Sequence, residues 1–280
     1  MDTKQLQDIA TQVRRDIIRM VHGANSGHPG GSLGCADFLT ALYFQIMDIK
    51  PENFTQNGNG EDMFFLSNGH ISPVLYSVMA RRGYFPVEEL ATFRKLHTRL
   101  QGHPSPVEGL PGIRIASGSL GQGVSVAIGA ALAKKANNDN HLVFVLTGDG
   151  ELQEGQIWEA FMFAGAKHVD NLIMTIDLNG KQIDGSTDQV CNLGRLRSKL
   201  EDSDWMVLKV DGNDMKKCVQ TLTLAKTLAH NGKPVAIVMK TEMGKGVDFM
   251  EGTHKWHGSA PNDEQAAAAL AQLPVTLGDY

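Results

Sequence analysis

Residues 148–185 read GDGELQEGQIWEAFMFAGAKHVDNLIMTIDLNGKQIDG, and this stretch decides the expected fold. An apolar run at 142–147 leads into Gly148-Asp149-Gly150. A second apolar run, at 172–177, leads into Asn179-Gly180 after a helical segment. A strand–helix–strand unit of this length returns the chain to the same edge of a parallel sheet. Ligands of open α/β sheets bind outside the carboxyl ends of the strands, so Asp149 and Asn179 are predicted to share a binding site.

The chemistry of this pair favours Mg²⁺ bound to a diphosphate. Mg²⁺ prefers oxygen ligands, and proteins usually supply only a few of them beside substrate phosphates and water. Gly148 and Gly150 allow the backbone to approach the ligand closely, and the following helix is expected to present free N–H groups to the anion. The alternative is a plain turn in which Asp149 caps that helix. A lone GDG is a weak motif, but the matching Asn-Gly at the next strand end strengthens the metal interpretation.

Composition narrows the class of protein. The chain has 280 residues, 42% of them hydrophobic, which fits a globular α/β protein of one large or two small domains. The net charge of −5, without a polybasic block, argues against a nucleic-acid partner. No apolar run approaches the roughly 20 residues of a membrane span, and the charged N-terminus does not read as a secretory signal. The widely spaced Cys35, Cys191 and Cys218 suit reduced thiols, so a cytoplasmic location is expected.

The pattern along the chain predicts an α/β fold with a doubly wound, mostly parallel sheet flanked by helices. Apolar runs and helical periodicities alternate, which is typical of such sheets. One domain is expected to span 1–280, with a loop-rich segment from about 244. The expected helices are 4–23, 33–47, 72–83, 87–97 and 121–136, and the expected strands are 63–67, 142–147, 172–177, 206–210 and 235–240.

Four histidines lie in glycine-rich loops, namely His28, His70, His103 and His257. A single loop histidine is more often a surface residue than a functional one, but four in similar settings beside a metal–diphosphate pair favour function. Neutral imidazoles both donate and accept hydrogen bonds, and they exchange protons near neutral pH. They therefore suit a polyhydroxylated substrate. A zinc site is disfavoured because no pair has the short ligand spacing of such sites, and His254 with His257 comes nearest.

These motifs together resemble the N-terminal, diphosphate-binding half of transketolase, a thiamine diphosphate enzyme. They run in the family's order across nearly the whole chain. The matching segments are SGHPGGSLGCAD (26–37), LSNGH (66–70), GHP (102–104), GSLGQG (118–123), GDGELQEGQIWEA (148–160), DLNGKQIDG (177–185) and GTHKWHG (252–258). The resemblance implies the thiamine diphosphate-binding fold and a transferase activity.

The resemblance also implies roles for particular residues. Asp149, Asn179 and the backbone carbonyl of Lys181 match the ligands of Mg²⁺, for which Ca²⁺ or Mn²⁺ are possible substitutes. In the family, Leu120 would contact the pyrimidine ring and Ile183 the thiazolium. The residues expected to contact the cofactor are Gly118, Ser119, Leu120, Gly148, Asp149, Gly150, Glu151, Asn179, Ile183, His70 and His257. Ser119 departs from the proline that family members often have there.

The expected catalytic set follows from the same resemblance. His28, His70, His103 and His257 match histidines that hold the cofactor or the sugar hydroxyls and assist proton transfer. Glu154 and Glu159 match carboxylates that lie at the subunit interface and help couple paired sites. Without the resemblance, both glutamates would read as a solvated helix face.

The chain is much shorter than a transketolase. Members of the family continue into a pyrimidine-binding domain, which supplies a glutamate that activates the cofactor and much of the pocket for the substrate phosphate. The chain is therefore expected to be one subunit of a split transketolase, or else a fragment of a longer chain. We favour the split enzyme, a heterotetramer with two copies of this chain and two of a C-terminal subunit. The expected reaction moves a two-carbon ketol unit from a ketose phosphate to an aldose phosphate.

Three other functions fit the sequence less well. A deoxyxylulose phosphate synthase-like subunit shares the GGSL and GDG features, but the histidines of GTHKWHG fit transketolase better. A non-catalytic cofactor-binding homologue would be expected to lack metal ligands or loop histidines, and both sets are present. A nicotinamide dinucleotide enzyme is disfavoured because GSLGQG is not the G-x-G-x-x-G fingerprint.

Overall fold

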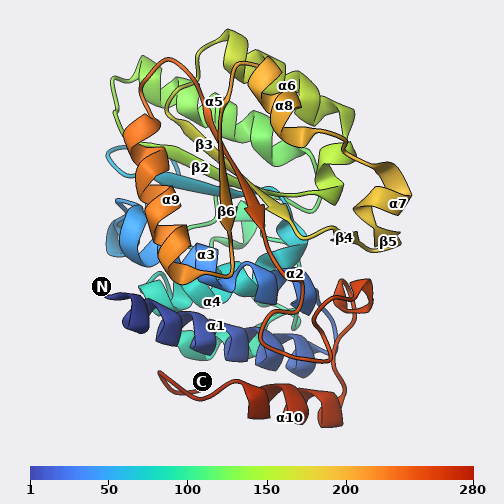
Figure 1. The fold of residues 1–280 in the computed structure, drawn as a ribbon. Coiled ribbons are helices and arrows are strands. Elements are labelled where there is room, and N and C mark those ends of the chain that lie inside the picture. Colours follow the sequence, from blue (N-terminus) through green and yellow to red (C-terminus); the bar gives the residue numbers. More distant parts are fainter.

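The computed structural model describes residues 1–280 and has a five-stranded sheet between two layers of helices (Figure 1). The strand order is β1-β2-β3-β7-β6, and every neighbouring pair is parallel. The predicted α/β fold is therefore confirmed, with strand bounds close to those expected. The strands are β1 (Met63–Leu66), β2 (Val143–Gly148), β3 (Leu172–Leu178), β6 (Met206–Asp211) and β7 (Val235–Lys240).

Both faces of the sheet are buried along β1, β2, β3 and β7, because these strands alternate their side chains between two hydrophobic clusters, while the edge strand β6 is only partly buried. Phe64 and Leu66 of β1 belong to one cluster, and Met63 and Phe65 belong to the other. Parallel strands buried in this way read as continuous apolar runs, as the sequence does. One layer contains α5 (Gln122–Ala136), α6 (Gly155–Ala166) and α8 (Leu196–Asp202). The other contains α1 (Thr3–Ala24), α3 (Ala36–Ala41), α4 (Ser72–Arg82) and α9 (Met215–Leu228).

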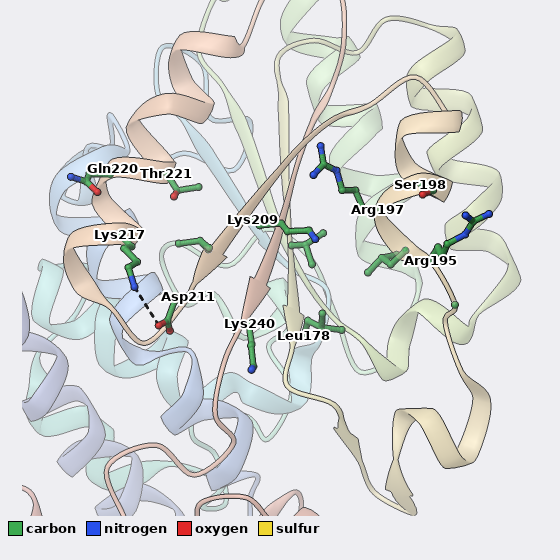
Figure 2. Close-up of a pocket in the computed structure, with 14 residues that line it drawn as sticks. Leu178, Arg195, Arg197, Ser198, Lys209, Asp211, Lys217, Gln220, Thr221 and Lys240 are labelled. Carbon is green, nitrogen blue, oxygen red and sulfur yellow. Dashed lines mark ion pairs between the residues drawn. The ribbon is translucent and has the colours of Figure 1, made fainter.

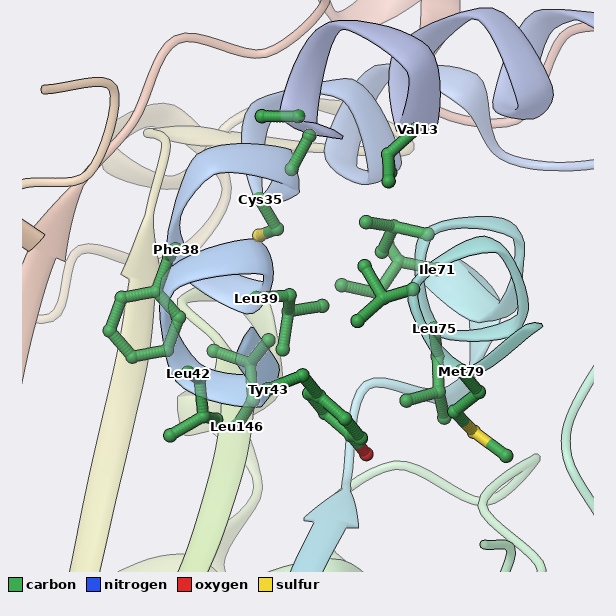
Figure 3. Packing of buried hydrophobic residues seen from close by; sticks show 14 of the residues in the cluster. Val13, Cys35, Phe38, Leu39, Leu42, Tyr43, Ile71, Leu75, Met79 and Leu146 are labelled. Atoms are coloured by element: carbon green, nitrogen blue, oxygen red, sulfur yellow. The ribbon is translucent and has the colours of Figure 1, made fainter. Parts of the chain in front are cut away.

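The second layer is anchored by α3, which lies between the sheet and α1 (Figure 3). Leu39 and Leu42 face Leu146 of β2 and the buried side chains of α4, and Val13 of α1 closes the cluster from above. This packing holds the loops before α3 and after β1 near the carboxyl ends of the strands. The C-terminal α10 (Asp263–Gln272) packs against α1. None of the helices combines the length and hydrophobicity that crossing a membrane requires.

Three helix predictions were wrong in detail. Residues 33–47 do not form one helix: α2 (Pro29–Gly34), α3 and a π-helical turn (Leu42–Ile46) follow one another. The backbone at Gly34 packs closely against the backbone at Glu242, because a Cβ on Gly34 would lie 3.0 Å from the carbonyl oxygen of Glu242. This contact with a distant part of the chain accompanies the break in the helix. Residues 87–97 form only a 3₁₀ turn (Val87–Thr92), since Arg94 and His97 have φ of 57° and 61°.

The third correction concerns the helix after the GDG turn. A 3₁₀ turn (Gly150–Gln153) comes first, and α6 begins only at Gly155. Asp149 accepts a hydrogen bond from the N–H of Gly150, so it caps this 3₁₀ turn and not an α-helix. The remaining short elements are β4 (Lys181–Gln182), β5 (Gly185–Ser186), α7 (Thr187–Cys191) and the 3₁₀ turns Pro51–Asn53, Gly69–Ile71, Pro106–Glu108 and His254–Trp256.

Candidate active site

A pocket of about 360 Å³ lies at the carboxyl ends of β1, β2 and β3. The structure brings together there most of the residues singled out in the sequence. Those lining it are His28, His70, His103, Gly118, Leu120, Gly148, Asp149, Gly150, Glu151, Asn179, Lys181, Ile183 and His257. Three further lining residues were not predicted, namely Asn68, Asp177 and Gln182.

Asp149 joins the two loops at the ends of β2 and β3. Its carboxylate accepts hydrogen bonds from the N–H of Gly150 at 2.8 Å and the N–H of Gly180 at 2.6 Å. The Oδ1 atom of Asn179 accepts from the N–H of Lys181 at 2.9 Å. The side-chain oxygens of Asp149 and Asn179 therefore lie on neighbouring loops, as the strand–helix–strand pattern predicted.

The pocket contains buried negative charge without a matching cation. Asp149, Glu151 and Asp177 are all at most 3% exposed, and no lysine or arginine forms an ion pair with any of them. Burial, reinforced by the nearby carboxylate of Asp177, raises the pKa of Asp149 to about 7. Uncompensated buried carboxylates are costly, so this arrangement favours binding of a cation.

Glu151, which lines the pocket, also joins several of its loops. Its carboxylate accepts hydrogen bonds from the hydroxyl of Ser67 and from the N–H groups of Gly121 and Gly148. These partners lie after β1, before α5 and at the end of β2. Glu151 therefore fixes three of the loops that form the pocket, and its side chain already has hydrogen-bond partners.

The four histidines form one group in the pocket. Their ring centroids are 5.1 Å apart for His28 and His70, 5.0 Å for His70 and His257, and 6.2 Å for His28 and His103. Burial lowers the pKa of all four, to about 4 for His28, and the neighbouring imidazoles lower it further for His28 and His70. All four are therefore neutral at pH 7 and offer both donors and acceptors.

These pKa shifts predict a pH dependence of stability. A histidine with a lowered folded pKa takes up its proton in the unfolded state first, so its contribution to stability is lost as pH falls from 6.5 towards 4. We expect His28→Gln to lose less stability than the wild type between pH 7 and pH 5. Urea unfolding of both proteins at the two pH values measures this difference. Equal losses would contradict the neutral, buried state of His28.

Three predicted residues lie outside the pocket lining. Ser119 is exposed in the loop before α5, and Glu154 and Glu159 are exposed at the start and on the outer face of α6. Two unpredicted residues carried weak signals in the sequence. Asn68 lies in LSNGH, two residues after the end of β1, and Asp177 is the only charged residue of β3. The Oδ1 atom of Asn68 is buried and lacks a hydrogen-bond partner.

A larger hollow, of about 930 Å³, lies along the outer edge of β6 (Figure 2). Lys209 and Arg197 point into it, and Lys217 forms an ion pair with Asp211 across its other side. Lysines on an edge strand prevent pairing with another chain. None of its lining side chains has a buried, unpartnered polar atom, whereas His28, Asn68 and His257 of the smaller pocket each have one. The smaller pocket is therefore the candidate site.

We compared the chain with known protein families, curated proteins and solved structures. Residues 5–276 match the model of a family described as transketolase, thiamine diphosphate binding domain. The chain belongs to the transketolase family. A solved transketolase from Campylobacter jejuni superposes with a TM-score of 0.89 at 36% identity, over 98% of this chain and 43% of that one. The transketolase-family chain thus spans less than half of that protein.

Two relatives have nearly the same length as this chain. One is named 6-deoxy-6-sulfo-D-fructose transketolase subunit SqwG, from Clostridium sp. (strain MSTE9), and is 39% identical over 96% of both chains. Another, from Phocaeicola vulgatus, is named as one subunit of an apulose-4-phosphate transketolase and is 36% identical over 98% of this chain and 94% of its own length. The prediction of a thiamine diphosphate-dependent transketolase subunit, which is a transferase, is confirmed.

Proposed function

We propose that this chain is the cofactor-holding subunit of a two-chain transketolase that moves a two-carbon ketol unit from a ketose phosphate to an aldose phosphate. The observation that carries the proposal is one pocket that joins Asp149 and Asn179 to four neutral histidines. The first pair suits a metal-bound diphosphate, and the histidines suit a polyhydroxylated substrate. The groups suited to the cofactor and the groups suited to the sugar substrate therefore lie in one pocket.

The residues of the pocket fit thiamine diphosphate and Mg²⁺, with Ca²⁺ or Mn²⁺ as substitutes. Asp149, the Oδ1 atom of Asn179 and the carbonyl of Lys181 form a set of hard oxygen donors. A Cβ on Gly150 would make a tight contact, 3.3 Å from the Cβ of Gln182, whereas one on Gly148 would lie at an ordinary contact distance of 3.8 Å from Asn68. Both glycines line the pocket, where the absence of a side chain leaves room for a diphosphate. A bound metal ion would also supply positive charge near the buried carboxylates of Asp149, Glu151 and Asp177, none of which forms an ion pair with a lysine or arginine.

The protein's own part in the reaction is binding, orientation and proton transfer. When bound, thiamine diphosphate supplies the nucleophilic carbon that accepts the two-carbon unit. Leu120 and Ile183 present partly exposed apolar side chains, 36% and 58%, to the pocket for contact with its rings. The neutral imidazoles of His28, His70, His103 and His257 hold sugar hydroxyls and exchange protons with them.

A partner subunit with the pyrimidine-binding domain is part of this proposal. Two relatives of the same length are named as subunits, and a solved transketolase is more than twice as long as this chain. Helices α5 and α6 lie side by side and expose Val126, Met162 and Phe163 by 42%, 60% and 45%. Glu159 has the helical spacing that puts it on the same face of α6 as Met162 and Phe163, and Glu154 immediately precedes this helix. Such an exposed patch is typical of a protein interface, and we assign it to the partner in a heterotetramer with two copies of each chain.

Calorimetry on the single chain tests the cofactor assignment. We expect thiamine diphosphate to bind when Mg²⁺ is present and to lose most of its affinity when a chelator removes the metal. Thiamine without its diphosphate should bind far more weakly. Equal affinity for the cofactor with and without a divalent ion would overturn the proposed site.

A further inference from the structure

Asp177 is a buried carboxylate directly behind the proposed metal site. It lies near the carboxyl end of β3 and is 1% exposed. Its Oδ2 atom accepts a hydrogen bond from the side-chain Nδ2 of Asn179 at 2.8 Å, and its Oδ1 atom accepts one from the hydroxyl of Thr241, just after β7. Both carboxylate oxygens of Asp177 therefore accept a hydrogen bond, one from the proposed metal ligand Asn179 and one from Thr241 at the end of β7.

These contacts permit only one orientation of the Asn179 amide. Its Oδ1 atom accepts from the N–H of Lys181 at 2.9 Å, while its Nδ2 atom donates to Asp177. A flipped amide would place two donors together at Lys181 and two acceptors together at Asp177, which loses both hydrogen bonds. The backbone N–H of Lys181 can only donate, so it binds the amide oxygen of Asn179, and the amide nitrogen is left to donate to Oδ2 of Asp177.

We propose that Asp177 is a positioning residue that holds Asn179 with its amide oxygen available to the divalent metal. The inference rests on the proposed function, since it concerns the same metal site. Groups behind a metal ligand fix its orientation, and their loss typically weakens metal binding about 10- to 100-fold. Thr241 keeps the carboxylate in place by tying it to the end of β7.

The simpler explanation is that Asp177 only ties β3 to the end of β7 and so stabilises the fold. A purely structural residue would lower the melting temperature of the metal-free chain without changing its affinity for metal and cofactor. Asp16 is a matched control, because it is also fully buried and binds Ser77 and Arg81 far from the pocket. Removing its charge affects the fold alone.

The experiment compares Asp177→Ala, Asp177→Asn and Asp16→Asn as full-length chains. Calorimetry gives the affinity for Mg²⁺ at saturating thiamine diphosphate, and thermal unfolding without metal reports the fold. We expect Asp177→Ala to weaken Mg²⁺ binding about 10- to 100-fold. Asp177→Asn keeps an acceptor for Asn179 and a polar group for Thr241, so its affinity should lie much closer to the wild type. Asp16→Asn should lower the melting temperature and leave the affinity unchanged.

Unchanged Mg²⁺ affinity in a folded Asp177→Ala variant would overturn the inference. If that variant does not fold, Thr241→Val replaces it, because valine keeps the side-chain volume and removes only the donor that anchors Asp177. A weaker affinity in Thr241→Val supports the inference, and an unchanged one overturns it. Failure of the proposed function would look different from failure of this inference. In that case the wild-type chain itself would show no Mg²⁺-dependent binding of thiamine diphosphate.

Discussion

Asp149→Asn is expected to reduce the metal-dependent affinity for thiamine diphosphate by about 100-fold or more, corresponding to about 3 kcal/mol. The substitution keeps the shape of the side chain but only one acceptor oxygen, whereas Oδ1 of Asp149 accepts from the N–H of Gly150 and Oδ2 accepts from the N–H of Gly180. One of these two hydrogen bonds is therefore lost along with the charge. The substitution removes the one charged ligand proposed for the metal. Thermal unfolding of the metal-free variant reports the effect of the lost hydrogen bond on the fold, so that the affinity for metal and cofactor can be assigned to the charge of Asp149.

Calorimetry with thiamine diphosphate and Mg²⁺ measures this effect. Asp184→Asn is a suitable control, because Asp184 lies in the loop after Lys181 but is exposed and does not line the pocket. Its affinity should match that of the wild type. Retention of wild-type affinity by Asp149→Asn would show that the metal lies elsewhere.

Phe163→Asp is expected to prevent stable association with the partner subunit while leaving cofactor binding by the single chain intact. Phe163 is 45% exposed beside Met162 on α6, so a charge there is tolerated in the free chain. In the assembled enzyme the same charge would be buried against apolar surface without a counter-ion. If Phe163 is one of the few residues that dominate the interface, which typically contribute about 2 kcal/mol or more each, the loss of partner affinity should exceed roughly 10-fold.

Sedimentation of mixtures of the two chains measures this association. Leu224→Asp is the matched control, since Leu224 is 47% exposed on α9, in the opposite helical layer (Figure 1). It should leave the assembly unchanged. Equal weakening by both substitutions would contradict an interface on α5 and α6.

Much of the site followed from the sequence because its residues lie at strand ends. The two apolar runs before Asp149 and Asn179 are β2 and β3, and parallel strands place their ends together. The four histidines are different, since they come from loops far apart in the sequence. Their gathering was implied only by the resemblance to transketolase and is seen directly in the contacts between their rings.

The residues that were missed share a physical reason. Asp177 ends an apolar run and reads as the last residue of a strand, and periodicity does not reveal that Thr241 and Asn179 supply its hydrogen bonds. The broken helix at 33–47 was equally hidden, because the approach of Gly34 to Glu242 joins distant parts of the chain. Local patterns predict elements well, but they do not predict which distant groups satisfy a buried polar atom.

The central claim is that this chain holds the cofactor of a transketolase whose active site needs a second chain. The most direct test measures two-carbon transfer from fructose 6-phosphate, 6-deoxy-6-sulfofructose and apulose 4-phosphate to an aldose phosphate, at saturating thiamine diphosphate and Mg²⁺. The assay is run with this chain alone and with both chains mixed. We predict no transfer by the chain alone and transfer from at least one donor in the mixture. Transfer by the single chain at the rate of the mixture would contradict the account.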